Sequence, residues 1–433
     1  MSEVLIYTLG VVVFLFGVAA SIALHEVGHM WPAKRFGVKV TQYFVGFGRT
    51  LWSVKRGETE YGVKAIPLGG YVKLVGMLPP ERGGDPHELR KADTGLLSQL
   101  ISDARHAEHE HVTEADQDRL FYRKPWWQKL IVMAGGPMTN VAISAVLFTV
   151  LIAGFGVEEP TTIVKAVADC AITDAEAGRP CTDADPITPA RRIGLQPGDR
   201  IVTFNGRAVE SWPDLTHAIR SNGDRVATLG IERGGSRIER SVATTVVARA
   251  SIDDPEKTQK VGFLGVEPRF AIVRHGVPTV GTVMWGYTTA TTNVIVHLLQ
   301  RMVDVAKAAV GAPRKSDGPI SVVGASRVAG ELVTVDHPSW RERSMRILAL
   351  LASLNLFLAL FNFIPLLPLD GGHIAGALWE AVRRGWAKLR GRPDPGYVDV
   401  ARMLPIAYGV GALLLVMGVL LIYADIVNPV RLS

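Results

Sequence analysis

Residues 21–29 read SIALHEVGH and close a run of 21 residues, Val4 to Leu24, that contains no charged side chain. A run of this length can cross a bilayer as one helix. Side chains four positions apart lie on the same face of a helix, so His25 and His29 can present two imidazoles to one zinc ion. Glu26 then stands beside them as a general base toward an attacking water. Polar side chains at the end of an apolar span are costly, which favours a functional site over a chance match.

The composition predicts a membrane protein with sizeable polar parts. Of the 433 residues, 48% are hydrophobic and 20% are charged, and the formal net charge is +6. The basic residues flank the apolar runs and do not gather on one aromatic-rich face, so we expect a lipid bilayer as a partner and no nucleic acid. The N-terminal run lacks a preceding Lys or Arg and exceeds the apolar core of a signal peptide, so we interpret it as a retained span.

Four apolar runs qualify as transmembrane helices, and the basic residues between them predict a topology. Lys and Arg cluster after the first run and between the third and the fourth, which makes both of these segments cytoplasmic. Both termini and residues 158–346 are then expected outside. A fifth stretch, residues 276–300, has a low apolar content and is interpreted as an interfacial or partly buried helix. The four runs are residues 4–24, 130–157, 347–369 and 403–423.

The third run ends in a second polar motif, NFIPLLPLDGGH at residues 362–373. Prolines and glycines break the helix here, and a carboxylate at such a break needs a partner. A zinc ion held by His25 and His29 would supply that partner to Asp370. Two His and one Asp, with water in the fourth position, make a catalytic and not a closed structural set. We therefore predict one zinc ion per chain, bound by these three residues.

Two other residues of this motif have open roles. Asn362 lies two helical turns before Asp370, where its amide either donates to a scissile carbonyl or developing oxyanion, or caps backbone freed near Pro365. His373 follows two glycines and is interpreted as facing the cytoplasmic surface, not as a spare ligand.

Residues 38–75 alternate apolar and polar side chains between glycines, which predicts β-hairpins. Strands directly after a membrane helix are expected to dip into the bilayer edge, where an unpaired edge can accept an extended peptide. Residues 79–124 are polar and mixed in charge, and are expected to form a mobile cytoplasmic loop. Their histidines fit a solvated loop better than a second metal site; they include His106, His109 and His111.

A small β-rich domain is indicated by residues 192–206, which read RIGLQPGDRIVTFNG and predict a turn, a strand and a second turn. Residues 211–220 follow as a helix with a serine cap and a proline in its first turn. Cys170 and Cys181 flank a proline-containing stretch on the face predicted to be outside. We favour a disulfide between them over two free cysteines.

Together these motifs resemble those of the site-2 proteases, zinc enzymes of regulated intramembrane proteolysis. The resemblance covers nearly the whole chain in the same order, and rests first on HExxH in an early span and NxxPxxPLDGG in a later one. The GLQPGDRI block is similar to the PDZ domain that bacterial members carry between their second and third spans. Gly46, Phe47 and Gly48 resemble the family's membrane hairpin, and GPMTN at residues 136–140 its second-span motif. A single PDZ domain is typical of the actinobacterial branch.

The resemblance implies an intramembrane zinc metalloendopeptidase of the inner (plasma) membrane. Its substrates are expected to be single-span membrane proteins, such as trimmed anti-sigma factors, cut at a site toward the cytoplasm. Glu26 would be the catalytic base, while the hairpin around Gly46, Phe47 and Gly48 would hold an unwound substrate strand. A zinc transporter would not need a glutamate between two ligands, and a membrane-anchored PDZ scaffold would dispense with the metal set; both stay open as alternatives.

The expected fold is a polytopic α-helical membrane protein with four transmembrane helices, a membrane-associated β-hairpin region and one extracytoplasmic PDZ-like α+β domain. The expected segments are the first span with the zinc motif (1–30), the hairpins and polar loop (31–126), the second span (127–157), the PDZ-like domain (158–272), an amphipathic or interfacial connector (273–345), the third span (346–372), a cytoplasmic loop (373–402) and the fourth span (403–424).

Overall fold

The computed structural model describes residues 2–79, 112, 114–173, 179–251, 258–314, 318–335 and 337–430. The chain forms two compact units: unit 1 comprises Met1–Phe155 and His275–Ser433, and unit 2 comprises Gly156–Arg274. Most of the polar loop expected at residues 79–124, including His106, His109 and His111, lies outside the described residues.

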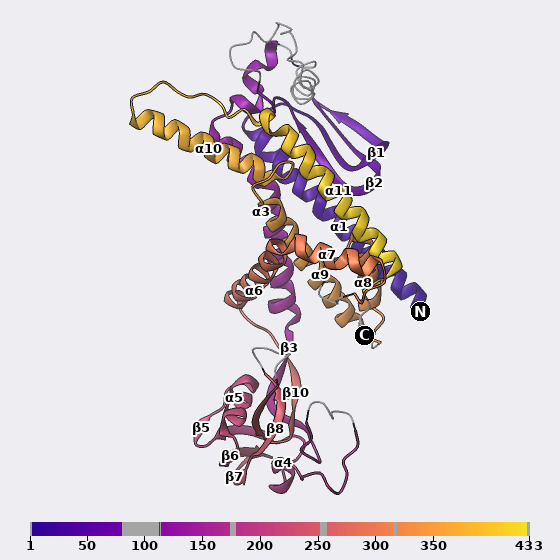
Figure 1. Ribbon diagram of the computed structural model, residues 1–433, viewed down its shortest axis with the longest axis vertical. Coiled ribbons are helices and arrows are strands. Elements are labelled where there is room, and N and C mark those ends of the chain that lie inside the picture. Colours follow the sequence, from indigo (N-terminus) through magenta and orange to yellow (C-terminus); the bar gives the residue numbers. More distant parts are fainter. Residues whose placement is uncertain are drawn as a thin grey trace. The chain divides into compact units, whose positions relative to one another are not determined.

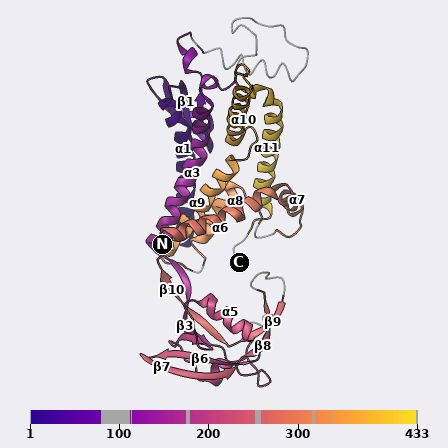
Figure 2. The ribbon, with the colours of Figure 1, turned by 90° about the vertical axis from the view of Figure 1, so that its left-hand side faces the viewer.

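Four helical segments of the described residues are long and apolar enough to cross a membrane, which fits a polytopic membrane protein. Helix α3 continues into a π-helical segment, η3, and a short 3₁₀ turn, η5, leads into the last helix. Helices α1, α3 and α9 lie side by side in both views (Figures 1 and 2). The segments are α1 (Glu3–Arg35), α3 (Trp126–Thr149) with η3 (Val150–Phe155), α9 (Trp340–Asn362), and η5 (Val400–Met403) with α11 (Leu404–Val427).

Polar side chains tie α1, α3 and α9 together inside the apolar bundle. The buried amide of Asn355 in α9 donates to Ser21 Oγ in α1 at 3.0 Å. The hydroxyl of Ser144 in α3 donates to the carbonyl oxygen of Ala352 in α9 at 2.9 Å. Without a strong hydrophobic drive between helices in lipid, such hydrogen bonds and close packing hold spans in register. Helix α1 carries the first polar motif that the sequence singled out, and α9 ends at the first residue of the second, Asn362.

The expected hairpins form one bent antiparallel pair, β1 (Val40–Arg56) and β2 (Thr59–Leu74). Residues 42–45 of β1 pair on one side with residues 70–73 and on the other with residues 60–63, so the pair is locally four-stranded. The bend in β1 falls at Gly46 and Gly48, whose φ angles of 94° and 82° suit glycine. The last part of β2 is therefore an edge strand.

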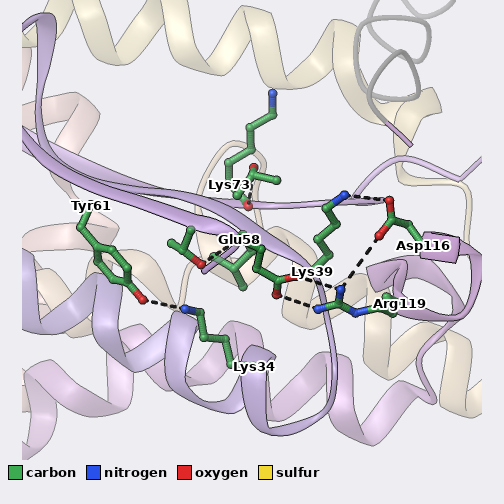
Figure 3. A network of polar contacts seen from close by, with 10 residues as sticks. Lys34, Lys39, Glu58, Tyr61, Lys73, Asp116 and Arg119 are labelled. Carbon is green, nitrogen blue, oxygen red and sulfur yellow. Dashed lines mark hydrogen bonds and ion pairs between the residues drawn. The ribbon is translucent and has the colours of Figure 1, made fainter. Parts of the chain in front are cut away.

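A polar network fixes this hairpin to the end of α1 (Figure 3). Lys34 Nζ donates to Tyr61 Oη at 2.6 Å, and Arg119 makes two hydrogen bonds to Glu58, at 2.8 and 2.6 Å. The Arg119 guanidinium lowers the pKa of the Glu58 carboxyl. Lys39 Nζ donates to Asp116 at 2.7 Å. The residues Asp116 and Arg119 lie in η1 (Glu114–Arg119), which precedes η2 (Phe121–Arg123) and α3.

The connector expected at residues 273–345 folds into three helices, α6 (Val277–Val296), α7 (Leu298–Ala309) and α8 (Val322–Leu332). Helix α8 packs closely against the first span. A Cβ atom on Gly330 would lie 2.5 Å from the Tyr7 ring, and one on Gly10 would lie 2.6 Å from Val333. Small residues allow this approach between helix backbones.

One expectation was wrong: residues 373–402 are not simply a loop. The third span stops at Asn362, before Pro365 and Pro368, and a new helix, α10 (Asp370–Leu389), then begins at Asp370. The charged residues suggested a solvated loop, but apolar residues recur on one side of them at helical spacing. In Figure 1, α10 starts beside α3 and extends away from the four candidate spans.

Unit 2 is a β-rich domain with one sheet in the order β10-β3-β4-β6-β7, to which β5 adds, and a separate β8-β9 pair. Helix α5 begins after Ser211, whose hydroxyl caps Asp214, as predicted. The core is apolar, with Ile201, Leu215 and Leu229 fully buried. The bounds are β3 (Val157–Val167), α4 (Pro189–Arg192), β4 (Arg200–Phe204), β5 (Arg207–Ala208), α5 (Trp212–Asn222), β6 (Val226–Arg233), β7 (Ser236–Ala243), β8 (Thr245–Ala250), β9 (Thr258–Phe263) and β10 (Val266–Val273).

One disulfide and one ion pair stabilise the loops of unit 2. Cys170 and Cys181 are joined by a disulfide, with Cα atoms 5.9 Å apart. The buried carboxylate of Asp199 accepts from Arg233 at 2.6 and 2.7 Å and from the backbone N–H of Gln196 at 2.8 Å. The Asp199 residue belongs to the predicted GLQPGD turn, which these bonds close onto β6.

We predict that unit 2 loses stability in acid through Asp199. The hydrogen bonds from Arg233 hold the pKa of this carboxyl below its usual value. Its contribution is therefore complete above the unfolded pKa, about 4, and is lost as the pH falls below that value. The urea midpoint of a fragment spanning residues 156–274 should fall between pH 6 and pH 3, and an Asp199→Asn variant should show a smaller fall. Equal falls in both proteins would contradict the prediction.

Candidate metal centre

Three side chains predicted as metal ligands converge in the structure. His25 and His29 lie one turn apart in α1, and Asp370 is the first residue of α10. His25 Nε2 and His29 Nε2 are 3.2 Å apart, and each lies 3.3 Å from Asp370 Oδ2. The side chains are 12%, 9% and 21% exposed, so they are largely shielded from water. The fold thus joins two motifs that are far apart in the chain.

The triangle of donor atoms fits a zinc ion. In tetrahedral coordination with bonds of about 2.0–2.2 Å, two ligand atoms stand roughly 3.3–3.5 Å apart, close to the observed separations. Asp370 Oδ2 is buried and has no hydrogen-bond partner among the described residues. His29 Nδ1 lies 2.8 Å from the carbonyl oxygen of Val132, which holds the ring proton there and leaves the Nε2 lone pair free. Acceptor atoms that face one another in this way need a cation between them.

Helix α3 presses against the ligands through a glycine. A Cβ atom on Gly136 would lie 2.2 Å from His29 Nε2 and 2.7 Å from His25 Nε2. The neighbouring residues are equally close, since a Cβ on Gly28 would lie 2.4 Å from the carbonyl oxygen of Gly135. Any side chain at Gly136 would occupy the space between the donor nitrogens. The glycine of the GPMTN motif therefore matters to the metal site because it has no side chain to fill this space.

A cavity of about 570 Å³ opens beside the three ligands. Glu26 lines it and interacts with the backbone N–H of Val72 in β2, while a Cβ atom on Gly70 would lie 3.0 Å from Glu26 Cγ. Asn362 also lines it, at the end of α9. So does Asn140, which is 1% exposed and whose Oδ1 has no partner among the described residues. The cavity thus combines a carboxylate, two amides and a strand edge around the ligand set.

Two sequence expectations about this site need revision. The side chain of His373 lines the cavity beside the three candidate ligands, because α10 winds directly on from Asp370. The hairpin residues Gly46, Phe47 and Gly48 form the bend of β1 and are not among the residues that line the cavity. Phe47 reaches the site only indirectly, by stacking on Tyr71 at 6.4 Å between ring centroids.

Two parts of the cavity wall do not stand out in the sequence: residues 69–72 of β2 and the amide of Asn140. Gly69 and Gly70 resemble the other glycines that punctuate the strands, and Asn140 is only the last residue of the GPMTN motif. Its position four residues after Gly136, on the same helix face, was a usable signal.

A buried ion pair holds α10 in place behind Asp370. Lys129 Nζ in α3 donates to Glu380 Oε2 in α10 at 2.7 Å, and these side chains are 8% and 2% exposed. Lys129 lies two turns before Gly136, and Glu380 lies three turns after Asp370. Removing one partner of such a pair leaves a buried charge and costs about 3–5 kcal/mol. The pair therefore sets the position of α10, and with it the Asp370 carboxylate, relative to α3.

In this site a spanning helix provides two imidazoles and a glutamate, and a second polar motif adds a carboxylate. This arrangement is typical of metallopeptidases with a site in the membrane. The model of peptidase family M50 matches residues 13–399. The chain therefore belongs to peptidase family M50, the site-2 protease family, as the motifs indicated.

Relatives in the same family agree with a zinc-dependent enzyme. The zinc metalloprotease Rip1 of Mycobacterium tuberculosis (strain H37Rv) is 35% identical over 454 residues, covering 99% of this chain and 100% of the relative. Rip1 of Mycolicibacterium smegmatis is 31% identical with the same coverage. The metalloprotease MmpA of Caulobacter vibrioides is 26% identical over 385 residues, or 86% of each chain. The mycobacterial relatives agree with the predicted actinobacterial branch, and the family implies a zinc metallopeptidase in a membrane.

Removing the Asp370 carboxylate should empty the metal centre. We predict that Asp370→Ala lowers zinc affinity at least about a hundredfold, because even the loss of a group that only orients a ligand costs 10- to 100-fold. Zinc content per chain in detergent-purified protein measures this directly. Asp118→Ala, which changes an exposed carboxylate, is the control and should retain zinc. Equal zinc in both variants would exclude Asp370 as a ligand.

Adding one methyl group to α3 should also disturb the centre. In Gly136→Ala the new Cβ meets both ligand nitrogens, and overpacking of this kind costs about 1–3 kcal/mol. We expect zinc retention to fall about tenfold against a competing chelator. Gly154→Ala, in the same span, has no neighbouring atom nearer than 4.0 Å and should bind zinc normally. Normal zinc binding by both variants would show that α3 does not confine the ligands.

Proposed function

We propose that the protein is a zinc metalloendopeptidase that hydrolyses peptide bonds within or near the transmembrane segments of single-span membrane proteins. The observation that carries this proposal is the convergence of His25, His29 and Asp370 beside Glu26, in a cavity at the ends of apolar spans. Zinc metalloprotease relatives over the full chain support it. We further propose one zinc ion per chain, held by those three residues.

The residues around the cavity have distinct roles in this chemistry. When bound, zinc would polarise a peptide carbonyl and lower the pKa of water toward neutrality. Glu26 accepts the proton of the attacking water and delivers it to the leaving amine. The amides of Asn362 and Asn140 can each donate to a carbonyl oxygen of the substrate, which fixes its position and stabilises developing negative charge. Gly136 keeps this space open.

A substrate helix must unwind before cleavage, because its own hydrogen bonds occupy the scissile carbonyl. The edge strand of β2 lies beside Glu26, and an exposed edge can pair with an extended peptide. We propose that residues 69–72 bind the unwound substrate, in place of the bend at Gly46, Phe47 and Gly48. Single-span proteins such as trimmed anti-sigma factors are the proposed substrates, on the basis of the family resemblance.

Unit 2 is proposed to be a PDZ domain on the extracytoplasmic side, which docks or filters trimmed substrates. Its support is the GLQPGD turn, which Asp199 closes, and helix α5 beside β9. The Cys170–Cys181 disulfide favours an oxidising compartment. The basic residues at the end of α1, and those in and after α10, favour the cytoplasm for the end of unit 1 that carries the metal centre. The proposed location is the inner membrane.

Replacing the proposed base tests the reaction separately from the metal. Glu26→Gln should retain zinc but cleave a single-span anti-sigma-factor substrate about 10²- to 10⁴-fold more slowly, since only proton transfer is lost. Cleavage is followed by gel in detergent or vesicles, and zinc content by elemental analysis. Unchanged cleavage by Glu26→Gln would exclude Glu26 as the base, and a transporter or a scaffold would keep its activity in this variant.

A further inference from the structure

The outward side of α10 carries a stripe of large apolar side chains. Trp379, Val382, Trp386 and Leu389 follow one another at intervals of three and four residues, so they share one helix face. They are 57%, 59%, 56% and 84% exposed. Farther along the helix, the buried residues Ala377 and Glu380 lie on the other side. Four large side chains in one row are more than scattered surface residues.

The other sides of α10 are already occupied. Lys129 of α3 binds Glu380, and the segment after the helix folds back along it. In that segment Asp394 pairs with Arg384 at 3.4 Å, and Arg383 donates to the carbonyl oxygen of Pro395 at 2.9 Å. The apolar stripe is the face that these contacts leave uncovered among the described residues.

Positive charge lies beside the stripe. Lys388, Arg390 and Arg392 are exposed and have no acidic partner among the described residues. The Arg390 guanidinium lies 4.3 Å from the centre of the Trp386 ring, which joins the basic end of the helix to its apolar face. A surface with this pattern is complementary to an anionic one that has an apolar interior.

Neither water nor the hydrocarbon core suits α10. The helix contains five charged residues, too many for the interior of a bilayer. Its row of tryptophan, valine and leucine side chains is equally unsuited to water. The helix stands between α9 and α11, two candidate spans, so it remains within reach of the bilayer surface. Tryptophan and basic residues together are typical of helices that lie in the membrane interface.

We propose that α10 is an interfacial helix that binds anionic lipids, with the stripe Trp379, Val382, Trp386 and Leu389 inserted among the acyl chains and the cations Lys388, Arg390 and Arg392 against the headgroups. Since Asp370 begins the same helix, lipid binding at one end holds the position of a metal-site carboxylate at the other. This inference does not depend on the reaction that the metal centre performs.

The test places a nitroxide label on each side of α10 in the full-length protein. The variants are Val382→Cys, in the middle of the stripe, and Lys388→Cys, on another face; both native cysteines are in the disulfide and do not react. Each is reconstituted into phosphatidylcholine vesicles with and without phosphatidylglycerol. Collision with oxygen reports acyl chains, and collision with a water-soluble nickel chelate reports water. A second Val382→Cys protein carries Arg390→Gln and Arg392→Gln.

In anionic vesicles the label at position 382 should meet oxygen and be shielded from nickel, while the label at position 388 should meet nickel. Replacing Arg390 and Arg392 by glutamine should shift the equilibrium between the inserted and the released helix about thirtyfold toward release. Omitting phosphatidylglycerol should shift it in the same direction. Monodisperse elution of each variant controls for folding.

Three results would overturn the proposal. Equal nickel contact at the two positions would place the stripe in water. Shielding of position 382 from both reagents would mean that protein covers it, either another part of this chain or a second copy of it. Shielding that is indifferent to lipid charge and to the two substitutions would mean apolar insertion without recognition of anionic lipid.

Discussion

Helices α1 and α3 approach each other so closely at the metal centre that Gly28, Gly135 and Gly136 leave no room for a Cβ atom. This contact brings the backbone of α3 against the imidazoles of His25 and His29, and it places the carbonyl oxygen of Val132 within reach of His29 Nδ1. The imidazole of His29 is thereby oriented by neighbouring backbone rather than by a flexible side chain. A metal site inside a membrane benefits from such rigidity because water cannot compensate for a misplaced polar group.

Helix α10 connects this contact to the rest of unit 1. It starts with Asp370, which completes the ligand triangle, and it is held to α3 by the buried Lys129–Glu380 pair. Two glycines after Asp370 allow the sharp turn, since a Cβ on Gly371 would lie 2.1 Å from the carbonyl oxygen of Ile364. The same helix presents its aromatic row outward. One element thus carries a metal ligand, a buried charge pair and the proposed lipid contact.

Much of the site could be predicted because its residues follow a characteristic spacing along the chain. The four-residue interval between His25 and His29 places both side chains on one helix face. Charged groups in an apolar run are costly, and they therefore indicate a functional site. The parts of the site that could not be predicted also have a physical explanation. The strand beside Glu26 could not be chosen from the hairpin sequence, because β1 bends at Gly46 and Gly48 and pairs on both sides, which brings residues 69–72 to the cavity. The helix α10 was mistaken for a loop because its charges outweighed its periodicity.

The sequence by itself determined the four apolar spans, the types of the candidate ligands and the glutamate beside them, since length, hydropathy and helical period are local properties. Only the tertiary structure decided that Gly136 confines the ligands, that Asn140 and residues 69–72 share their cavity, and that His373 turns toward it. These facts depend on the distance between helix backbones and on the path of a bent sheet. Both are set by packing between segments far apart in the chain, which no local pattern encodes.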